Sequence, residues 1–230
     1  MSIDMAEDVE QTTPLKVRLF ESVRRQLIGH GFVLNAVRDN FVRRHDGITD
    51  IFQLTCLDAK PGYRILPGVA VRIERVENIF HETSGFERKY QKDTPTMGTR
   101  MGSLLTGSPR ACEFLLESES EIASVTEMIV GVFREFAPPY FEKWGSLAAI
   151  DAELNDKPGE RMHNRALAWF RCSTGIIVAK LVGRHNYGEL VAFYTDVMTR
   201  DNKGFYLKRF QALVKSLESV EPGSGLANQP

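Results

Sequence analysis

The amino-acid sequence predicts an α+β fold, in which an N-terminal helix packs on an antiparallel sheet of about four or five strands and more helices follow. Apolar residues between positions 13 and 27 recur at the spacing of an amphipathic helix. Between positions 31 and 75 apolar and polar residues alternate, and short turn sequences separate the alternating runs. Because short turns join antiparallel neighbours, these runs predict hairpins. From position 118 onward the helical spacing returns.

The first predicted helix begins at Thr13 and Pro14, a capping residue followed by proline at the first helical position. The helix packs on the sheet through an apolar stripe that ends before Gly29 and consists of Leu15, Leu19, Val23 and Leu27.

The predicted strands are rich in β-branched and aromatic residues and read GFVLNAV, NFVRR, ITDIFQLTCL and PGVAVRIERV. In the last of them Val69, Val71 and Ile73 alternate with Arg72 and Glu74. We therefore expect one packed face of the sheet and one polar face exposed to solvent.

Residues 77–110 lack a clear period and predict a long loop, which in a compact domain is typically functional or mobile. Residues 111–116 then predict a returning strand. One helix follows from residue 118 and ends at Pro138 and Pro139, where a second helix begins. Pro158 and Gly159 end that helix and mark the predicted domain boundary.

The rest of the chain predicts an all-helical extension with helices over 161–170, 175–182, 189–198 and 205–217. We expect an α+β domain over 13–157, a helical extension over 160–217, and disordered tails over 1–12 and 221–230. The seam between the two domains is expected to contain aromatic side chains, namely Tyr140, Phe141, Trp144, Trp169 and Phe170.

Several segments together resemble a family of uncharacterised bacterial domains of unknown function. They are a helix closing on GF, a hairpin carrying FVRR, the loop TRMGSLLTGSPR, and a helix running into APPYFEKWGSLAAI. The resemblance spans residues 13–155. It implies an α+β fold and transfers no catalytic residue.

Composition and charge exclude several classes of protein. No apolar run approaches the roughly 18 to 20 residues that span a membrane, and the acidic start of the chain is unlike a signal peptide, so we expect a cytoplasmic protein that does not enter membranes.

The three cysteines are scattered and predict buried free thiols. Residues 112–160 hold 11 acidic and 3 basic side chains between two basic flanks. That pattern predicts either packing between the parts or a partner surface.

The glycine-rich segment TMGTRMGSLLTGSPR lacks the lysine and the following helix of a nucleotide-binding loop. Two arginines of this segment belong to a candidate cluster that could bind a carboxylate or a phosphate. The cluster consists of Arg100 and Arg110, of Arg64 and Arg72 from the polar sheet face, and of His81. In the alternative interpretation these arginines pair with an acidic helix that contains Glu117, Glu119 and Glu121.

The five histidines show no metal-ligand spacing, and the sequence carries no nucleophile motif, so we expect no metal, no cofactor and no catalytic residue. The leading hypothesis is a non-enzymatic module that binds a protein partner through the polar sheet face and residues 77–110. The alternative is an enzyme or binder that acts on a phosphorylated or nucleic-acid ligand through the arginine cluster. Nucleic acid is the weaker ligand because neither basic flank carries a dense stripe of Lys and Arg.

Overall fold

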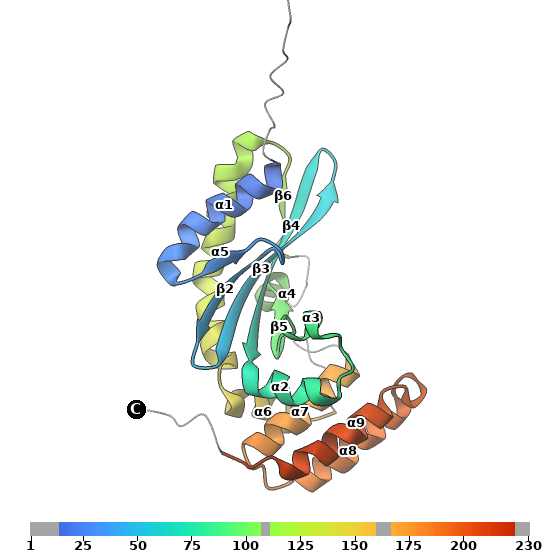
Figure 1. Cartoon of the computed structure of the whole chain (residues 1–230). Coiled ribbons are helices and arrows are strands. Elements are labelled where there is room, and N and C mark those ends of the chain that lie inside the picture. The colour runs from blue at the N-terminus through green and yellow to red at the C-terminus, as the bar shows by residue number, and fades with distance from the viewer. Residues whose placement is uncertain (1–13, 107–110, 160–166, 224–230) are drawn as a thin grey trace, which may run out of the picture.

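The computed structural model describes residues 14–106, 111–159 and 167–223. It confirms the predicted α+β fold, with an N-terminal helix, an antiparallel sheet and a helical C-terminal region. The tips of two long strands lie at one end of the molecule, and the C-terminal helices lie at the other (Figure 1). The predicted tail over 1–12 and residues 224–230 of the tail predicted over 221–230 fall outside the described residues. Gly223 is ordered, because its N–H donates to the carbonyl oxygen of Leu181 at 2.9 Å.

The sheet has six strands among the described residues, and every pair is antiparallel. The strand order is β1-β2-β3-β4-β5, and β6 also pairs with β4. The returning strand predicted over 111–116 is β6, and β5 is the strand that was not predicted; both are short and pair with different stretches of β4. The bounds are β1 Val33–Asn35, β2 Asn40–His45, β3 Ile48–Ala59, β4 Gly62–Ile73, β5 Met97–Arg100 and β6 Phe114–Leu116.

Helices α1 (Leu15–Leu27) and α5 (Ile122–Trp144) lie against one face of the sheet, here called the inner face (Figure 1). The aromatic side chain of Phe52 on β3 stands edge-on to Phe133 of α5, with ring centroids 5.1 Å apart. Phe41 of β2 is likewise fully buried. Each such side chain stabilises the fold by roughly 1.5–3 kcal/mol, so this layer fixes which face of the sheet is covered.

The predicted loop over 77–110 is wrong for most of its length. It contains the end of α2 (Glu74–Thr83), then α3 (Arg88–Gln91), β5 and α4 (Met101–Thr106). In α2 the buried side chains Val76, Ile79 and Phe80 have helical spacing, but the helix is too short to give a long periodic signal. β5 is recognised only through its pairing with β4, which a sequence pattern of four residues does not reveal.

The predicted helix break at Pro138 and Pro139 is also wrong, because α5 runs through both prolines to Trp144. A proline inside a helix costs about 3 kcal/mol. Buried side chains on either side, including Phe133, Ala137 and Phe141, hold the helix against the sheet and offset that cost. The next helix is α6 (Leu147–Asn155), whose first turn is capped by the hydroxyl of Ser146.

The C-terminal region contains α7 (Ala168–Leu181), α8 (Tyr187–Arg200) and α9 (Leu207–Ser216). Residues 161–166 of the helix predicted over 161–170 lie outside the described residues, and its end and the helix predicted over 175–182 form one continuous helix, α7. Short 3-10 turns lie at Ile28–His30, Glu119–Glu121, Asp201–Gly204 and Leu217–Ser219.

The aromatic seam between the two parts differs from the prediction. Trp169 and Phe170 of α7 pack on Phe80 of α2, with ring centroids 5.6 Å and 5.7 Å from it. Tyr140 and Trp144 contact each other at the end of α5 instead. The buried side chains of both parts form one continuous cluster, so the helical region packs directly on the end of the α+β part.

Candidate interaction surface on the outer face of the sheet

The strand register assigns side chains to the face of the sheet opposite α1 and α5, here called the outer face. Since side chains alternate along a strand, the residues paired across the ladders share a face. One row across β3, β4 and β5 consists of Gln53, Gly68 and Arg100. A second row, across β3, β4 and β6, consists of Leu57, Arg64 and Leu115. The predicted polar sheet face is thus identified residue by residue.

A shallow groove of about 300 Å³ lies on the outer face between β3, β4 and β5. The groove forms where small residues lie side by side. A Cβ atom added to Gly98 would approach the Cβ of Ala70 to 3.1 Å. One added to Gly68 would approach the carbonyl oxygen of Thr99 to 3.2 Å. Polar side chains line the groove, among them Gln53, Thr55 and Arg100.

Two exposed apolar side chains of this face lie in the second row. Leu57 is 46% exposed and Leu115 is 55% exposed, although both belong to strands. They flank Arg64, whose Nε lies 3.7 Å from a carboxylate oxygen of Glu113. The outer face therefore combines a polar groove with an exposed apolar row, a mixture found in protein interaction surfaces.

All the charged side chains that the register of the described strands places on the outer face are arginines. They are Arg44, Arg64, Arg72 and Arg100. Arg44 and Arg100 are exposed and form no ion pair with any residue in the described part of the chain. Arg44 and Arg100 are therefore available to pair with acidic groups of a partner, whereas Arg64 and Arg72 already lie beside carboxylates.

The predicted arginine cluster is not assembled as one site. Arg100 lies opposite Gly68, and Arg64 lies four residues further along β4. At about 3.3 Å per residue the two backbone positions are about 13 Å apart, and the guanidinium group of Arg64 lies beside Glu113. Arg110 lies outside the described residues. Among the described arginines Arg64, Arg72 and Arg100, none pairs with Glu117, Glu119 or Glu121: Glu119 pairs with Arg18 of α1, and Glu121 caps its own helix.

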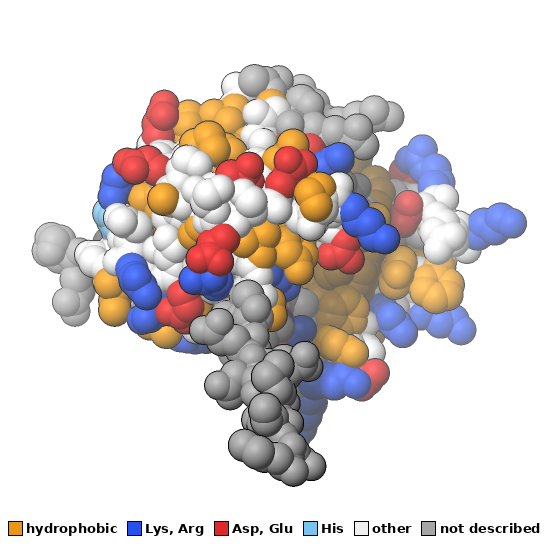
Figure 2. Space-filling model, turned by 90° about the horizontal axis from the view of Figure 1, so that it is seen from above, with side chains coloured by type: hydrophobic (Ala, Val, Ile, Leu, Met, Phe, Trp, Pro, Cys, Tyr) orange, Lys and Arg blue, Asp and Glu red, His pale blue; other side chains and the backbone are white. Residues whose placement is uncertain are grey.

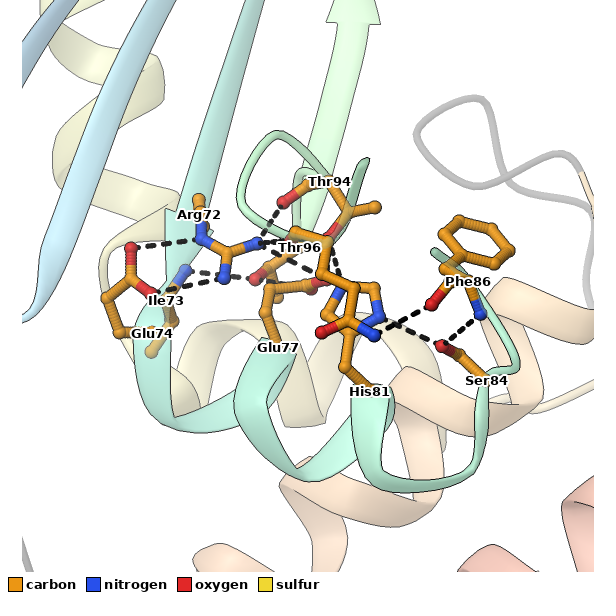
Figure 3. A network of polar contacts seen from close by, with 10 residues as sticks. Arg72, Ile73, Glu74, Glu77, His81, Ser84, Phe86, Thr94 and Thr96 are labelled. Carbon is orange, nitrogen blue, oxygen red and sulfur yellow. Dashed lines mark hydrogen bonds and ion pairs between the residues drawn. The ribbon is translucent and has the colours of Figure 1, made fainter. Parts of the chain in front are cut away.

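Arg72 and His81 lie together in a buried polar network between β4, α2 and the segment before β5 (Figure 3). Arg72 was expected on a solvent-exposed face but is only 4% exposed. Its Nε donates to Glu74 at 2.9 Å, and its Nη1 donates to the carbonyl oxygens of Gln91 and Thr94 at 2.9 Å and 2.8 Å. The side chain is therefore covered by the chain that follows α2, which the sequence pattern does not reveal.

Glu77 is the carboxylate at the centre of the network. Its side chain is 1% exposed and accepts hydrogen bonds from Thr94 at 2.7 Å and from Thr96 at 2.9 Å. Arg72 lies 3.9 Å away and supplies a positive charge close to the carboxylate. A buried carboxylate requires both hydrogen bonds and a counter-charge, and Glu77 has both.

His81 connects the network to the residues after α2. Its Nε2 lies 2.7 Å from the hydroxyl of Thr94, and its Nδ1 lies 2.9 Å from the hydroxyl of Ser84. Burial lowers the pKa of His81 below its ordinary value; the nearby carboxylate of Glu77 opposes that shift and Arg72 adds to it. A neutral ring that donates from Nε2 to Thr94 and accepts from Ser84 at Nδ1 satisfies all of these contacts.

The network positions the outer face rather than forming a catalytic site. It fixes the segment before β5, whose Pro95 lines one side of the groove. Arg38 from the turn after β1 reaches the same segment and pairs with Asp93 at 2.5 Å. A site for catalysis would need these groups at the surface of a cavity, and Arg72, Glu77 and Thr96 are instead enclosed by protein.

The described residues contain no group of three or more His, Cys, Asp or Glu side chains that could hold a metal ion. The three thiols are free, and burial raises the pKa of Cys56 to about 11 and that of Cys172 to about 12. They are therefore protonated and poorly nucleophilic near neutral pH.

Sequence reasoning missed Gln53, Thr55, Gly68 and Gly98 as members of the surface. The available signal was the alternation in ITDIFQLTCL, which places Gln53 and Thr55 on the same side of one strand. Gly68 and Gly98 lie beside each other only because β4 pairs with β5, and the sequence pattern does not predict β5.

A scan against protein-family models and searches of curated proteins and of solved structures find no match to this chain. Within the described residues, no helix is both long enough and apolar enough to cross a membrane.

Proposed function

We propose that this protein is a non-enzymatic interaction module that binds an acidic segment of a partner protein on the outer face of its sheet and on the adjoining part of residues 77–110. The observation that carries the proposal is the open part of the outer face: α1 and α5 cover the inner face (Figure 1), whereas the outer face retains a groove and an exposed apolar row, although Ile51 and Leu66 of the same face are buried.

The charge of the outer face supports an acidic partner. The charged side chains that the register places on it are arginines: Arg100 lines the groove, and Arg64 lies in the second row, far enough from Arg100 for the two to contact separate carboxylates along an extended segment. Leu57 and Leu115 add apolar area that such a partner can cover. Charged contacts of this kind mainly raise the association rate and set the specificity.

The geometry disfavours the alternative of a phosphate-directed enzyme or nucleic-acid binder. Arg72 is enclosed, and Arg64 and Arg100 do not converge on one point. Figure 2 shows the molecule from the end at which the tip of the β3–β4 hairpin lies. In the near part of this view, acidic and basic side chains are interspersed with hydrophobic ones. A nucleic-acid surface would need Lys and Arg gathered along one stripe.

The cytoplasmic location and the resemblance to the uncharacterised bacterial domain family remain part of this proposal. Free thiols at Cys56, Cys112 and Cys172 support the location, because reducing compartments keep thiols unpaired.

The test is photo-crosslinking in the native cell with a photoreactive amino acid placed at Gln53 on the outer face, and in a second variant at Met128 on α5. Met128 is 46% exposed and lies on the helix that covers the inner face. We expect one stoichiometric acidic protein to be captured from Gln53 and not from Met128.

Charge reversal then identifies the surface that the partner contacts. Arg100→Glu is expected to abolish capture from Gln53, whereas Arg25→Glu, which changes an exposed arginine of α1 by the same charge, is expected to preserve it. Equal capture from both positions, or capture that survives Arg100→Glu unchanged, would contradict the proposal.

A further inference from the structure

Residues 1–13, here called the acidic segment, directly precede α1 and lie outside the described residues. They include four acidic side chains and no Lys or Arg. Successive side chains of an extended segment alternate between two sides. By that alternation one side carries Asp4, Asp8 and Glu10, and the other carries Ile3, Met5, Glu7 and Val9. A surface that offers both positive charge and apolar area therefore suits this segment.

The acidic segment joins the described part of the chain beside the edge of the sheet at β6. Helix α1 begins at Leu15, and its Arg18 pairs with Glu119, three residues after the end of β6. Figure 1 likewise shows the start of α1 next to β6. Among the described strands β6 pairs only with β4, so no strand covers its other edge. The chain can therefore pass over this edge from the inner face to the outer face.

The acidic segment is long enough to reach both Arg64 and Arg100. An extended chain spans about 3.3 Å per residue. The four steps from residue 14 back to residue 10 span about 13 Å, which exceeds the thickness of a sheet layer, about 10 Å. The seven steps from residue 10 back to residue 3 add about 23 Å, compared with about 13 Å between the backbone positions of the two arginines.

The open part of the outer face offers the matching groups. Arg100 is exposed and forms no ion pair with any described residue. The side chain of Arg64 is 46% exposed, and its Nε lies 3.7 Å from Glu113, which is longer than a hydrogen bond. A guanidinium has five N–H donors, so Arg64 can accept a second carboxylate beside it. Leu57 and Leu115, exposed on either side of Arg64, provide the apolar area.

We propose that residues 3–10 of the acidic segment bind the outer face of their own chain and compete there with the acidic partner. The competition rests on the function proposed above, because it concerns the same surface. A segment attached by a few residues has an effective concentration in the millimolar range, so a weak contact is enough to occupy the face. The partner then binds only the fraction of molecules in which the face is free.

The first experiment compares backbone amide signals of the ¹⁵N-labelled full-length wild type with those of a neutralised variant. That variant carries Asp4→Asn, Glu7→Gln, Asp8→Asn and Glu10→Gln. We expect the amides of Gly68, Gly98 and Arg100 to differ between the two proteins. Sodium chloride at about 0.5 M should move the wild-type signals toward those of the neutralised variant, because salt screens exposed charge pairs.

A matched control removes the same number of charges from exposed positions on α5 and α8. It carries Glu127→Gln, Glu135→Gln, Glu142→Gln and Glu189→Gln. The amides of Gly68, Gly98 and Arg100 should keep their wild-type signals in this control variant. The proposal is overturned if the neutralised variant shifts these amides no more than the control variant does.

Photo-crosslinking then locates the contact. A photoreactive amino acid at Met5 should form crosslinks within one chain, to outer-face residues of β3, β4 or β6, and these should be lost in the neutralised variant. Irradiating a mixture of ¹⁴N- and ¹⁵N-labelled protein separates crosslinks within a chain from those between chains. Crosslinks that mainly join two chains, or that lie mainly on α5, would contradict the proposal.

The affinity of the partner captured from Gln53 tests the competition. The neutralised variant should bind that partner about threefold or more tightly than the wild type, which corresponds to a face occupied in about two thirds of the molecules or more. The control variant should bind as the wild type does. Equal affinities of the wild type and the neutralised variant would overturn the competition. The amide and crosslinking experiments use no partner, so failure to capture one contradicts the proposed function without deciding this contact.

Discussion

Replacing Thr96 by valine tests whether the buried network fixes the segment that borders the outer face. Thr96 is fully buried, accepts a hydrogen bond from the backbone N–H of Ile73 at 2.9 Å, and donates to Glu77 at 2.9 Å. Valine has nearly the same shape but cannot make either bond. The substitution therefore removes polar contacts without opening a cavity.

The magnitude follows from the two lost bonds. Leaving the N–H of Ile73 unpaired in the interior costs about 1–3 kcal/mol, and the lost bond to the carboxylate of Glu77 costs about 1.5–3 kcal/mol. The added methyl group stabilises the fold by about 0.8 kcal/mol. We expect the free energy of unfolding to fall by about 3 kcal/mol.

The assay is urea unfolding followed by circular dichroism, with the midpoint and the slope compared between variants. Thr55→Val is the matched control, because Thr55 lies on the outer face and its hydroxyl forms no hydrogen bond with the described part of the chain. It should change the free energy of unfolding by less than about 0.5 kcal/mol. A loss below about 0.5 kcal/mol for Thr96→Val as well would refute the role given to the network.

Three further predictions concern other parts of the molecule. The pKa of His81 is lower in the folded protein, so the unfolded chain binds a proton at this side chain more readily. The free energy of unfolding should therefore fall as the pH drops below about 6.5, and His81→Asn should flatten that dependence when unfolding is measured between pH 5 and 7.5. Gly98→Val fills the floor of the outer groove, so partner capture should be lost, and unchanged capture would exclude the groove from the interface; because its Cβ would approach the Cβ of Ala70 to 3.1 Å, some loss of stability is expected, and urea unfolding checks that the variant is folded. A thiol reagent at pH 8 should react slowly with the native protein and rapidly after unfolding, because burial keeps thiols such as Cys56 protonated; fast native reaction would contradict this assignment.

Local patterns in the sequence predict most of the fold. The stripe from Leu15 to Leu27 and the alternation in the first hairpins reflect contacts that repeat along one element, so they are visible without knowing its neighbours. The strand β5 and the continuation of α5 through Pro138 depend on contacts with distant parts of the chain. Tertiary packing decides such elements, and a local pattern does not contain it.

The candidate surface was predictable only in part. The alternation around Arg72 correctly indicates which residues share a face, but it does not show that the chain after α2 covers Arg72 while leaving Arg100 exposed. Likewise, the spacing of Arg64 and Arg100 along the sheet follows from the pairing of β5 with β4. Long-range strand pairing therefore decides whether charged residues form one cluster or separate contacts.

The most direct test of the proposed interaction is the affinity of the partner captured from Gln53, measured by calorimetry with the wild type, Arg100→Glu and Arg25→Glu. The account predicts that Arg100→Glu weakens binding about tenfold or more and that the wild-type affinity falls as salt is added, because the contact depends on opposite charges. Arg25→Glu should bind as the wild type does. Equal affinities for all three proteins, independent of salt, would contradict a binding surface on the outer face of the sheet.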